Sequence, residues 1–109
     1  MRSLLLLLIS VVCWGQTTHK VTLTWQDALN PAGTTYSVYR TVGLCSGSPT
    51  FSKLASALTT KTYDDATVAP GNYCYVVTAT LNGMESAQSN AASAPVPSFP
   101  PTNLQVTVQ

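Results

Sequence analysis

The stretch Pro70–Leu81, with the sequence PGNYCYVVTATL, reads as a tight turn that leads into the longest β-strand of the chain. Aromatic and β-branched residues dominate it from Tyr73 onward, and these residue types favour strands. The dipeptide Asn82-Gly83 follows directly and is a strong hairpin signal. We therefore expect a long strand over Tyr73–Leu81 and a partner strand over roughly residues 85–94.

Shorter strand-like segments precede this strand at regular intervals and are separated by turn residues. No segment has the periodicity of an amphipathic helix, so the pattern predicts an all-β sandwich. The segments are Val21–Trp25, Tyr36–Arg40, Phe51–Leu54 and Lys61–Asp64.

Taken together and in this order, these segments resemble fibronectin type III domains, especially the bacterial extracellular kind. The resemblance runs from Lys20 to about Ala94 and implies an immunoglobulin-like β-sandwich. The matching segments are VTLTW at 21–25 with its core tryptophan, YSVYR at 36–40, TYDD at 62–65, PGNYCYVVTA at 70–79 and ESAQSN at 85–90.

The resemblance also gives Tyr73 a structural role. This residue takes the place of the tyrosine-corner residue, whose hydroxyl hydrogen-bonds to the backbone upstream. The chain contains no Arg-Gly-Asp tripeptide, so the resemblance does not imply integrin binding.

The N-terminal residues 1–15 have the layout of a secretory signal peptide. Arg2 precedes the apolar run Leu4–Val12, and small residues at Cys13 and Gly15 suit a cleavage site after Gly15. The run is shorter than the roughly 20 residues that span a bilayer. A lipid anchor on Cys13 is the rival interpretation. We expect a mature domain over residues 16–94 that is secreted or extracellular, with the cell surface included.

Cleavage would leave two cysteines, Cys45 and Cys74, in an exported chain. Their spacing matches no zinc pattern, and the chain offers a single histidine. An even pair in an oxidising compartment favours a disulfide over two free thiols.

The C-terminal end carries a second unusual segment. A proline-rich linker at residues 95–101 leads to residues 102–109, in which Leu104, Val106 and Val108 alternate with polar residues as in a half-buried strand. Relatives of this fold begin with a strand ahead of the one at Val21–Trp25, and Gln16–Lys20 is too short and polar to provide it.

The first strand is therefore expected to be missing at the N-terminus, and the C-terminal tail can supply it. The acceptor edge would be the strand that carries Val21, Leu23 and Trp25. The linker is too short to bring the tail back along its own domain in the normal direction. We expect insertion into a second molecule, in the manner of β-strand donation.

Catalysis has little support in the sequence, and no cofactor or metal motif occurs. His19 is expected to be solvated near the mature terminus. Asp64 and Asp65 are adjacent on a strand and should point to opposite faces, so a turn or strand-end role outweighs a calcium site. Tyr39 and Arg40 are expected to pack on the sheet surface, with a binding face as the alternative.

The composition argues against nucleic-acid and membrane partners. Only 8% of the residues are charged and the formal net charge is +1, so the sequence offers neither a basic surface for nucleic acid nor a basic amphipathic helix for a membrane.

Three functions stay open for this non-enzymatic protein. It can be a structural subunit that forms homo-oligomers or fibres head to tail. It can be a monomeric adhesion module that binds an extracellular protein or carbohydrate through loops such as Gly43–Pro49. It can also be a fragment of a multidomain protein.

Overall fold

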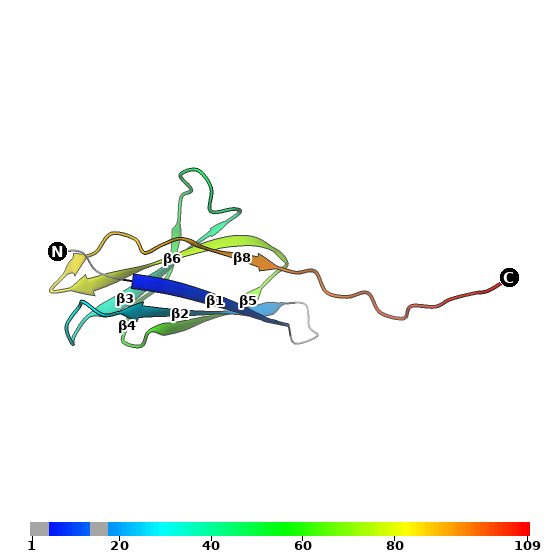
Figure 1. Cartoon of the computed structure of the whole chain (residues 1–109), viewed down its shortest axis with the longest axis horizontal. Helices are drawn as coiled ribbons and strands as arrows, with labels where there is room; N and C mark the ends of the chain where they lie inside the picture. Colours follow the sequence, from blue (N-terminus) through cyan, green and yellow to red (C-terminus); the bar gives the residue numbers. More distant parts are fainter. Residues whose placement is uncertain (1–4, 14–17) are drawn as a thin grey trace.

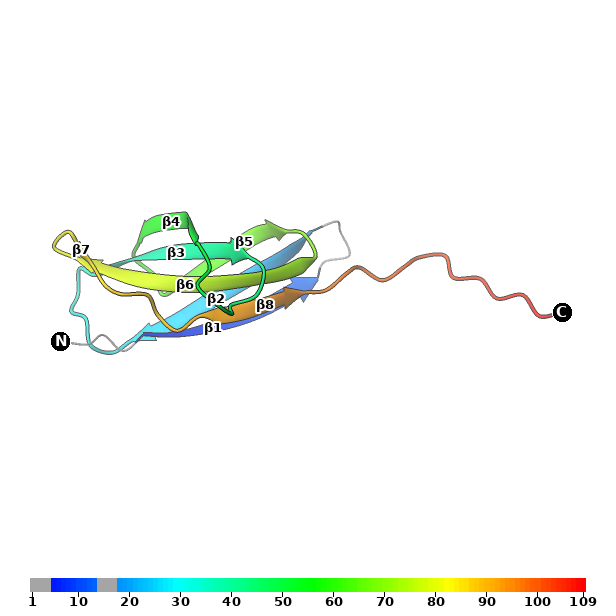
Figure 2. The same ribbon diagram turned by 90° about the horizontal axis from the view of Figure 1, so that it is seen from above.

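The computed structural model describes residues 5–13 and 18–109. Within these residues the chain forms eight strands and no helix, arranged as two sheets packed face to face (Figures 1 and 2). The strands are β1 (Leu5–Cys13), β2 (His19–Asp27), β3 (Thr35–Val42), β4 (Ser52–Leu58), β5 (Thr62–Val68), β6 (Gly71–Leu81), β7 (Met84–Glu85) and β8 (Ala92–Val96).

One sheet has the order β1-β2-β5, and the other has the order β4-β3-β6 with both β7 and β8 paired to β6. Every pairing is antiparallel. This is the all-β sandwich that the spacing of the strand signals predicts.

The core lies between the two sheets. Alternate residues of β6 face it, as the period of a strand requires: Tyr73, Tyr75, Val77 and Ala79 all belong to the buried cluster. Val21, Leu23 and Trp25 of β2 meet them from the other sheet and are almost fully buried. The ring of Trp25 packs edge-on against that of Tyr36, with 5.5 Å between the centroids.

Residues 5–13 form the first strand in this structure, which corrects the expectation that no strand stands beside β2. They pair with β2 along its whole length, from Leu5 opposite Asp27 to Cys13 opposite His19. A continuous apolar run suits a buried strand as well as a signal sequence, so periodicity could not separate the two. Residues 1–4 and 14–17, including the predicted cleavage site, lie outside the described residues.

The partner strand predicted for residues 85–94 is two short strands, β7 and β8, with a loop between them. Asn82 and Gly83 both have positive φ, 52° and 76°, as a tight hairpin between β6 and β7 requires. In the loop, the hydroxyls of Ser86 and Ser89 accept hydrogen bonds from the backbone N–H groups of Ala79 and Val77. Side chains thus replace part of the regular pairing along this edge of β6.

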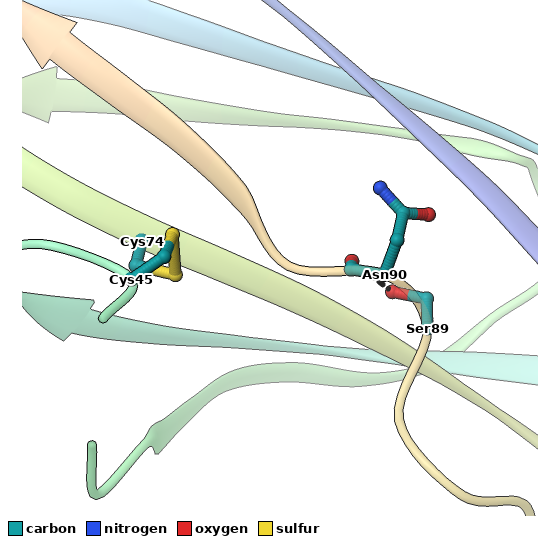
Figure 3. The surroundings of a disulfide bond; sticks show 4 residues. All are labelled: Cys45, Cys74, Ser89 and Asn90. Carbon is teal, nitrogen blue, oxygen red and sulfur yellow. Dashed lines mark hydrogen bonds between the residues drawn. A yellow bond between two sulfur atoms is a disulfide. The ribbon is translucent and has the colours of Figure 1, made fainter. Parts of the chain in front are cut away.

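The predicted disulfide is confirmed. Cys45, in the loop after β3, bonds to Cys74 on β6, with Cα atoms 5.2 Å apart (Figure 3). Cys74 turns away from the core-facing residues of β6 and is fully covered. Gly43 N–H also donates to the Asn72 carbonyl at 2.8 Å, so this loop is tied to β6 at two points.

The C-terminal residues after β8 leave the sandwich as an extended tail (Figures 1 and 2). The molecule measures 71 × 28 × 19 Å along its principal axes, with a radius of gyration of 17.3 Å. A compact chain of this length would have a radius of gyration of about 13 Å. The excess reflects the tail, whose residues 97–109 form no strand.

Candidate functional site

The candidate site is the edge of β2 together with the strand that covers it. Leu7 of β1 lies opposite Trp25, Ile9 opposite Leu23, and Val11 opposite Val21. These three β1 residues face inward: Leu7 is buried, and Ile9 and Val11 pack against the buried cluster. The predicted acceptor residues therefore lie on a strand whose edge is paired with residues 5–13 in this structure.

The outward face of β1 does not match a solvent-facing strand. Leu6 and Leu8 point away from the core and are 43% and 55% exposed. A sheet with one wet face normally carries polar residues at such positions. The inward side chains of β1 therefore suit a buried position, whereas its outward leucines are apolar groups exposed to solvent.

Asn90, in the loop before β8, holds the backbone of the covering strand. Its side-chain Oδ1 accepts a hydrogen bond from the Leu7 N–H at 3.1 Å. In Figure 3 the amide of Asn90 points toward the blue ribbon of β1. Because Leu7 turns this N–H away from β2, Asn90 satisfies a donor on the open side of the strand.

The apolar side chains of the tail are exposed to solvent. Leu104, Val106 and Val108 are 90%, 80% and 88% exposed. They are the residues predicted to insert beside β2, and in this single chain the tail does not contact that edge (Figures 1 and 2). The tail therefore presents three apolar side chains at alternate positions, with no sheet to pack against in this chain.

The root of the tail, meaning Phe99 and the residues next to it, is in contrast held against the sandwich. Phe99 stacks on His19, with ring centroids 4.3 Å apart and an angle of 10° between the planes. His19 is fully buried, which corrects the prediction that it is solvated. It begins β2, between Val68 of β5 and Cys13 of β1, and the Phe99 ring covers one face of its imidazole. Among the described residues its two ring nitrogens have no hydrogen-bond partner.

A polar bridge between the two sheets was not predicted. Asp65 on β5 accepts hydrogen bonds from the Arg40 guanidinium and the Tyr75 hydroxyl, both at 2.7 Å. Burial and the bond to Asp65 raise the pKa of Tyr75. Burial opposes the charge on Arg40, but Asp65 outweighs it and raises the pKa of Arg40. Arg40 therefore lies between the sheets, which corrects the expectation that it packs on the sheet surface; it shares the core side of β3 with Tyr36 and Val38, as alternation along a strand requires.

Asp64, by contrast, lies on the opposite face of β5. It accepts a hydrogen bond from the Thr22 hydroxyl at 2.9 Å, and the Lys20 ammonium lies 4.0 Å away. The two adjacent carboxylates therefore point to opposite sides, as alternation on a strand predicts. Within residues 5–13 and 18–109, no group of three or more potential metal ligands comes together.

Tyr39 lies on the outer face of the second sheet, as predicted. Its hydroxyl bonds to Glu85, which also accepts from the Thr78 hydroxyl at 2.6 Å. The Lys53 ammonium lies 5.6 Å from the centre of the Tyr39 ring. The hydrogen bonds from Thr78 and then Tyr39 lower the pKa of Glu85. These neighbours favour packing for Tyr39.

Comparison with solved structures places the arrangement of the strands in a known class. A crystal structure described as an Fn3-like protein from Clostridium thermocellum matches with a TM-score of 0.60 at 28% sequence identity, over 88% of this chain and 92% of that chain. The chain has the fibronectin type III fold. A solution structure of a fourth FNIII domain from human also matches with a TM-score of 0.60, at 19% identity, over 93% of this chain and 83% of that one.

No protein-family model matches the sequence, and no curated protein matches it significantly. The described residues include no helix long and apolar enough to span a membrane.

Within the fibronectin type III fold, Tyr73 makes the contact expected of a tyrosine corner. Its hydroxyl donates to the Ala69 carbonyl at 2.9 Å, four residues upstream. The Arg40 guanidinium lies 5.4 Å from the centre of the same ring.

The substitution Tyr73→Phe should lower the free energy of unfolding by about 0.5 to 1.5 kcal/mol, because it removes one hydrogen bond and keeps the ring. Denaturant unfolding of the two proteins measures the difference. Tyr63→Phe is the matched control, since within residues 5–13 and 18–109 the Tyr63 hydroxyl makes no hydrogen bond like that of Tyr73. Equal midpoints for wild type and Tyr73→Phe would contradict the role given to this hydroxyl.

A buried carboxylate, that of Asp27, closes the turn after β2. Asp27 accepts from the Asn30 side chain at 2.7 Å and from the Tyr36 hydroxyl at 3.0 Å. Burial works against the charge of Asp27, but the bonds from Asn30 and Tyr36 outweigh burial and lower its pKa. Burial and the same carboxylate raise the pKa of Tyr36 to about 12.

The lowered pKa predicts a pH-dependent contribution to stability. The folded pKa of Asp27 lies below its unfolded value of 3.8, so its contribution is complete above that value and is lost as the pH falls through the folded pKa. Asp27→Asn should therefore destabilise the domain by about 1 to 2 kcal/mol at pH 7, with a smaller difference at pH 3. Urea midpoints at both pH values measure it, and a difference that does not change with pH contradicts the prediction.

Proposed function

We propose that the protein is an exported, non-enzymatic structural subunit that joins head to tail by donating its C-terminal strand to the β2 edge of the next copy. The contact is heterologous, with a tail on one molecule and the β2 edge on the other. Such contacts extend into open fibres unless the rotation between copies closes a ring.

The observation that carries the proposal is the exposed apolar face of the tail. Leu104, Val106 and Val108 alternate with polar residues, as a half-buried strand does, yet each is at least 80% exposed. Adding a strand to a sheet edge would satisfy both its apolar side chains and its backbone groups.

In this proposal, signal-peptide removal during export leaves the β2 edge without its partner strand. In the proposed pathway the signal sequence, residues 1–15, is removed, and the chain that begins at Gln16 lacks β1. The β2 edge would then leave unpaired backbone groups beside the core residues Val21, Leu23 and Trp25. The disulfide between Cys45 and Cys74 is compatible with an oxidising, extracellular compartment.

Geometry favours a second molecule as the acceptor. Phe99 is held on His19, beside Cys13 at the end of β1. Leu7 lies six residues back along β1, about 20 Å away at the rise of a strand. The five steps from Phe99 to Leu104 span about 15 to 18 Å, and the prolines favour a straight path. A tail that starts at this root therefore cannot bring Leu104 to the position of Leu7 in its own chain.

The expected energies suit association. Burying three side chains of this size contributes about 5 to 8 kcal/mol before the costs of ordering and of joining two molecules. The prolines at 97, 100 and 101 restrict the free tail to extended conformations, which reduces the ordering cost.

Light scattering coupled to size-exclusion chromatography of residues 16–109, at several concentrations, tests the proposal. We expect multimers whose mass increases with concentration. The control of equal length replaces Leu104, Val106 and Val108 with serine and should be monomeric. If residues 16–109 are themselves monomeric at high concentration, strand donation to a second copy is wrong.

A second candidate is a binding module for an extracellular protein or carbohydrate. Val42 ends β3 and Leu44 lies in the disulfide-tied loop that follows, and both apolar side chains are exposed. This function predicts a monomer that loses ligand binding when Val42 and Leu44 are replaced with serine.

A further inference from the structure

Strand β1 and the tail share a sequence pattern. Residues 7–11 read Leu-Leu-Ile-Ser-Val, and residues 104–108 read Leu-Gln-Val-Thr-Val. The inward positions are Leu, then Ile or Val, then Val in both segments, and the fourth position carries a hydroxyl in both. Both segments are thus suited to the same row of core contacts.

The main difference between the segments falls on the outward face. Leu8, which is 55% exposed in β1, corresponds to Gln105, and the exposed Leu6 corresponds to Asn103. Polar residues at these two positions remove the apolar surface that β1 presents to solvent. The tail is therefore the better match to a strand with one buried and one wet face.

From this match we propose the register of the donated strand, which rests on the proposed function: Leu104 of one copy takes the position of Leu7 against Trp25 of the next. Val106 then lies opposite Leu23, and Val108 lies opposite Val21. The strand runs antiparallel to β2, as β1 does.

Asn90 is a positioning residue in this register. In the present structure its Oδ1 accepts from the N–H of Leu7. With Leu104 in that position, the same oxygen receives the Leu104 N–H of the incoming strand. A shift of the strand by one residue would turn its apolar face to solvent, and a shift by two would leave one of the three inward contacts unfilled.

The register has a direct consequence for assembly. Because residues 5–13 and the tail occupy the same positions along β2, one acceptor holds either its own β1 or a donated tail, and not both. A chain that keeps residues 5–13 can donate a tail but cannot accept one, so its addition should end a growing fibre.

Chemical cross-linking between paired variants, each with one added cysteine besides the Cys45–Cys74 disulfide, tests the register. One chain of residues 16–109 carries Thr24→Cys or Thr22→Cys on β2, and the other carries Gln105→Cys or Thr107→Cys in the tail. By the pairing of Leu8 with Thr24 and Ser10 with Thr22, the proposed register brings 105 to 24 and 107 to 22. A short thiol-reactive cross-linker should join these two pairs several-fold more efficiently than 105 with 22 or 107 with 24.

The outcomes separate the register from the proposed function. Preferred cross-linking of 105 with 22, or of 107 with 24, overturns the register while strand donation stands. Absence of any cross-linked product, in chains that light scattering finds monomeric, overturns both.

Binding of a synthetic peptide of residues 101–109 tests the role of Asn90. The acceptor is residues 16–102, and Asn90→Ala should weaken binding of the peptide about three- to tenfold, as expected for one hydrogen bond. Asn90→Asp keeps an acceptor oxygen and should restore most of the affinity. Gln88→Ala, in the same loop, is the control. Equal affinities for wild type and Asn90→Ala contradict the role of Asn90.

Discussion

A chain that contains only residues 16–102 is expected to be the least stable form of this protein. It lacks both β1 and the tail, so the β2 edge that pairs with β1 is open and the core residues Leu23 and Trp25 lose their contacts on that side. The lost burial is worth about 5 to 8 kcal/mol. That amount is comparable with the whole stability of a typical domain, about 5 to 15 kcal/mol. Denaturant unfolding followed by tryptophan fluorescence should give a midpoint far below that of residues 1–109.

A synthetic peptide of residues 101–109 should restore the stability of this truncated chain. A ligand that binds only the folded state stabilises it in proportion to the logarithm of its concentration above Kd. The midpoint should therefore rise steadily with peptide concentration. A peptide with serine in place of Leu104, Val106 and Val108 is the matched control and should have no effect.

One outcome of these measurements would contradict strand donation. If residues 16–102 are as stable as residues 16–109 and do not respond to the peptide, the tail does not complete the sandwich. The binding-module function, tested at the exposed Val42 and Leu44, would then be favoured.

Loss of the disulfide is expected to have the second large effect. The bond closes a loop with a sequence separation of 29 residues, for which chain entropy predicts a stabilisation of about 3 to 4 kcal/mol. The double variant Cys45→Ala/Cys74→Ala should lose about that amount. Denaturant unfolding of residues 16–109 measures it, and these residues contain no other cysteine.

Reduction of the wild-type chain is the control, because it breaks the disulfide without leaving the cavity that alanine leaves at the substituted positions. Cys74 is fully buried, so its replacement by alanine also removes packing. If reduction of the native disulfide lowers stability by less than 1 kcal/mol, the bond does not act through chain entropy as described.

Much of the fold could be predicted from local sequence patterns. The strands β2 to β6 and the hairpin at Asn82-Gly83 follow from alternation and turn residues, which are short-range signals. The edge after β7 could not be predicted, because the Ser86 and Ser89 hydroxyls bond to β6 in place of regular pairing. A serine in an extended segment gives no sign of such a bond until its partner strand is placed.

The candidate site was predictable only in part. Alternation of Leu104, Val106 and Val108 predicted a strand with no place in its own sheet, and the order of the segments predicted β2 as its acceptor; both stay predictions. The apolar run at residues 5–13 fits both a signal sequence and the first strand, and length and periodicity do not separate these roles. The positions of Asn90 and Phe99 depend on contacts between distant segments, which residue type alone does not reveal.

The direction of β1 and β8 has a mechanical consequence. Both strands run toward the same end of the sandwich, and the tail continues outward from that end (Figures 1 and 2). In a fibre joined by donated tails, tension would enter an acceptor at the start of the incoming strand and leave through its own tail at the opposite end. The pull would act along β2, so the backbone hydrogen bonds of the junction would share the force together. Each junction would resist by shear and would not open one bond at a time.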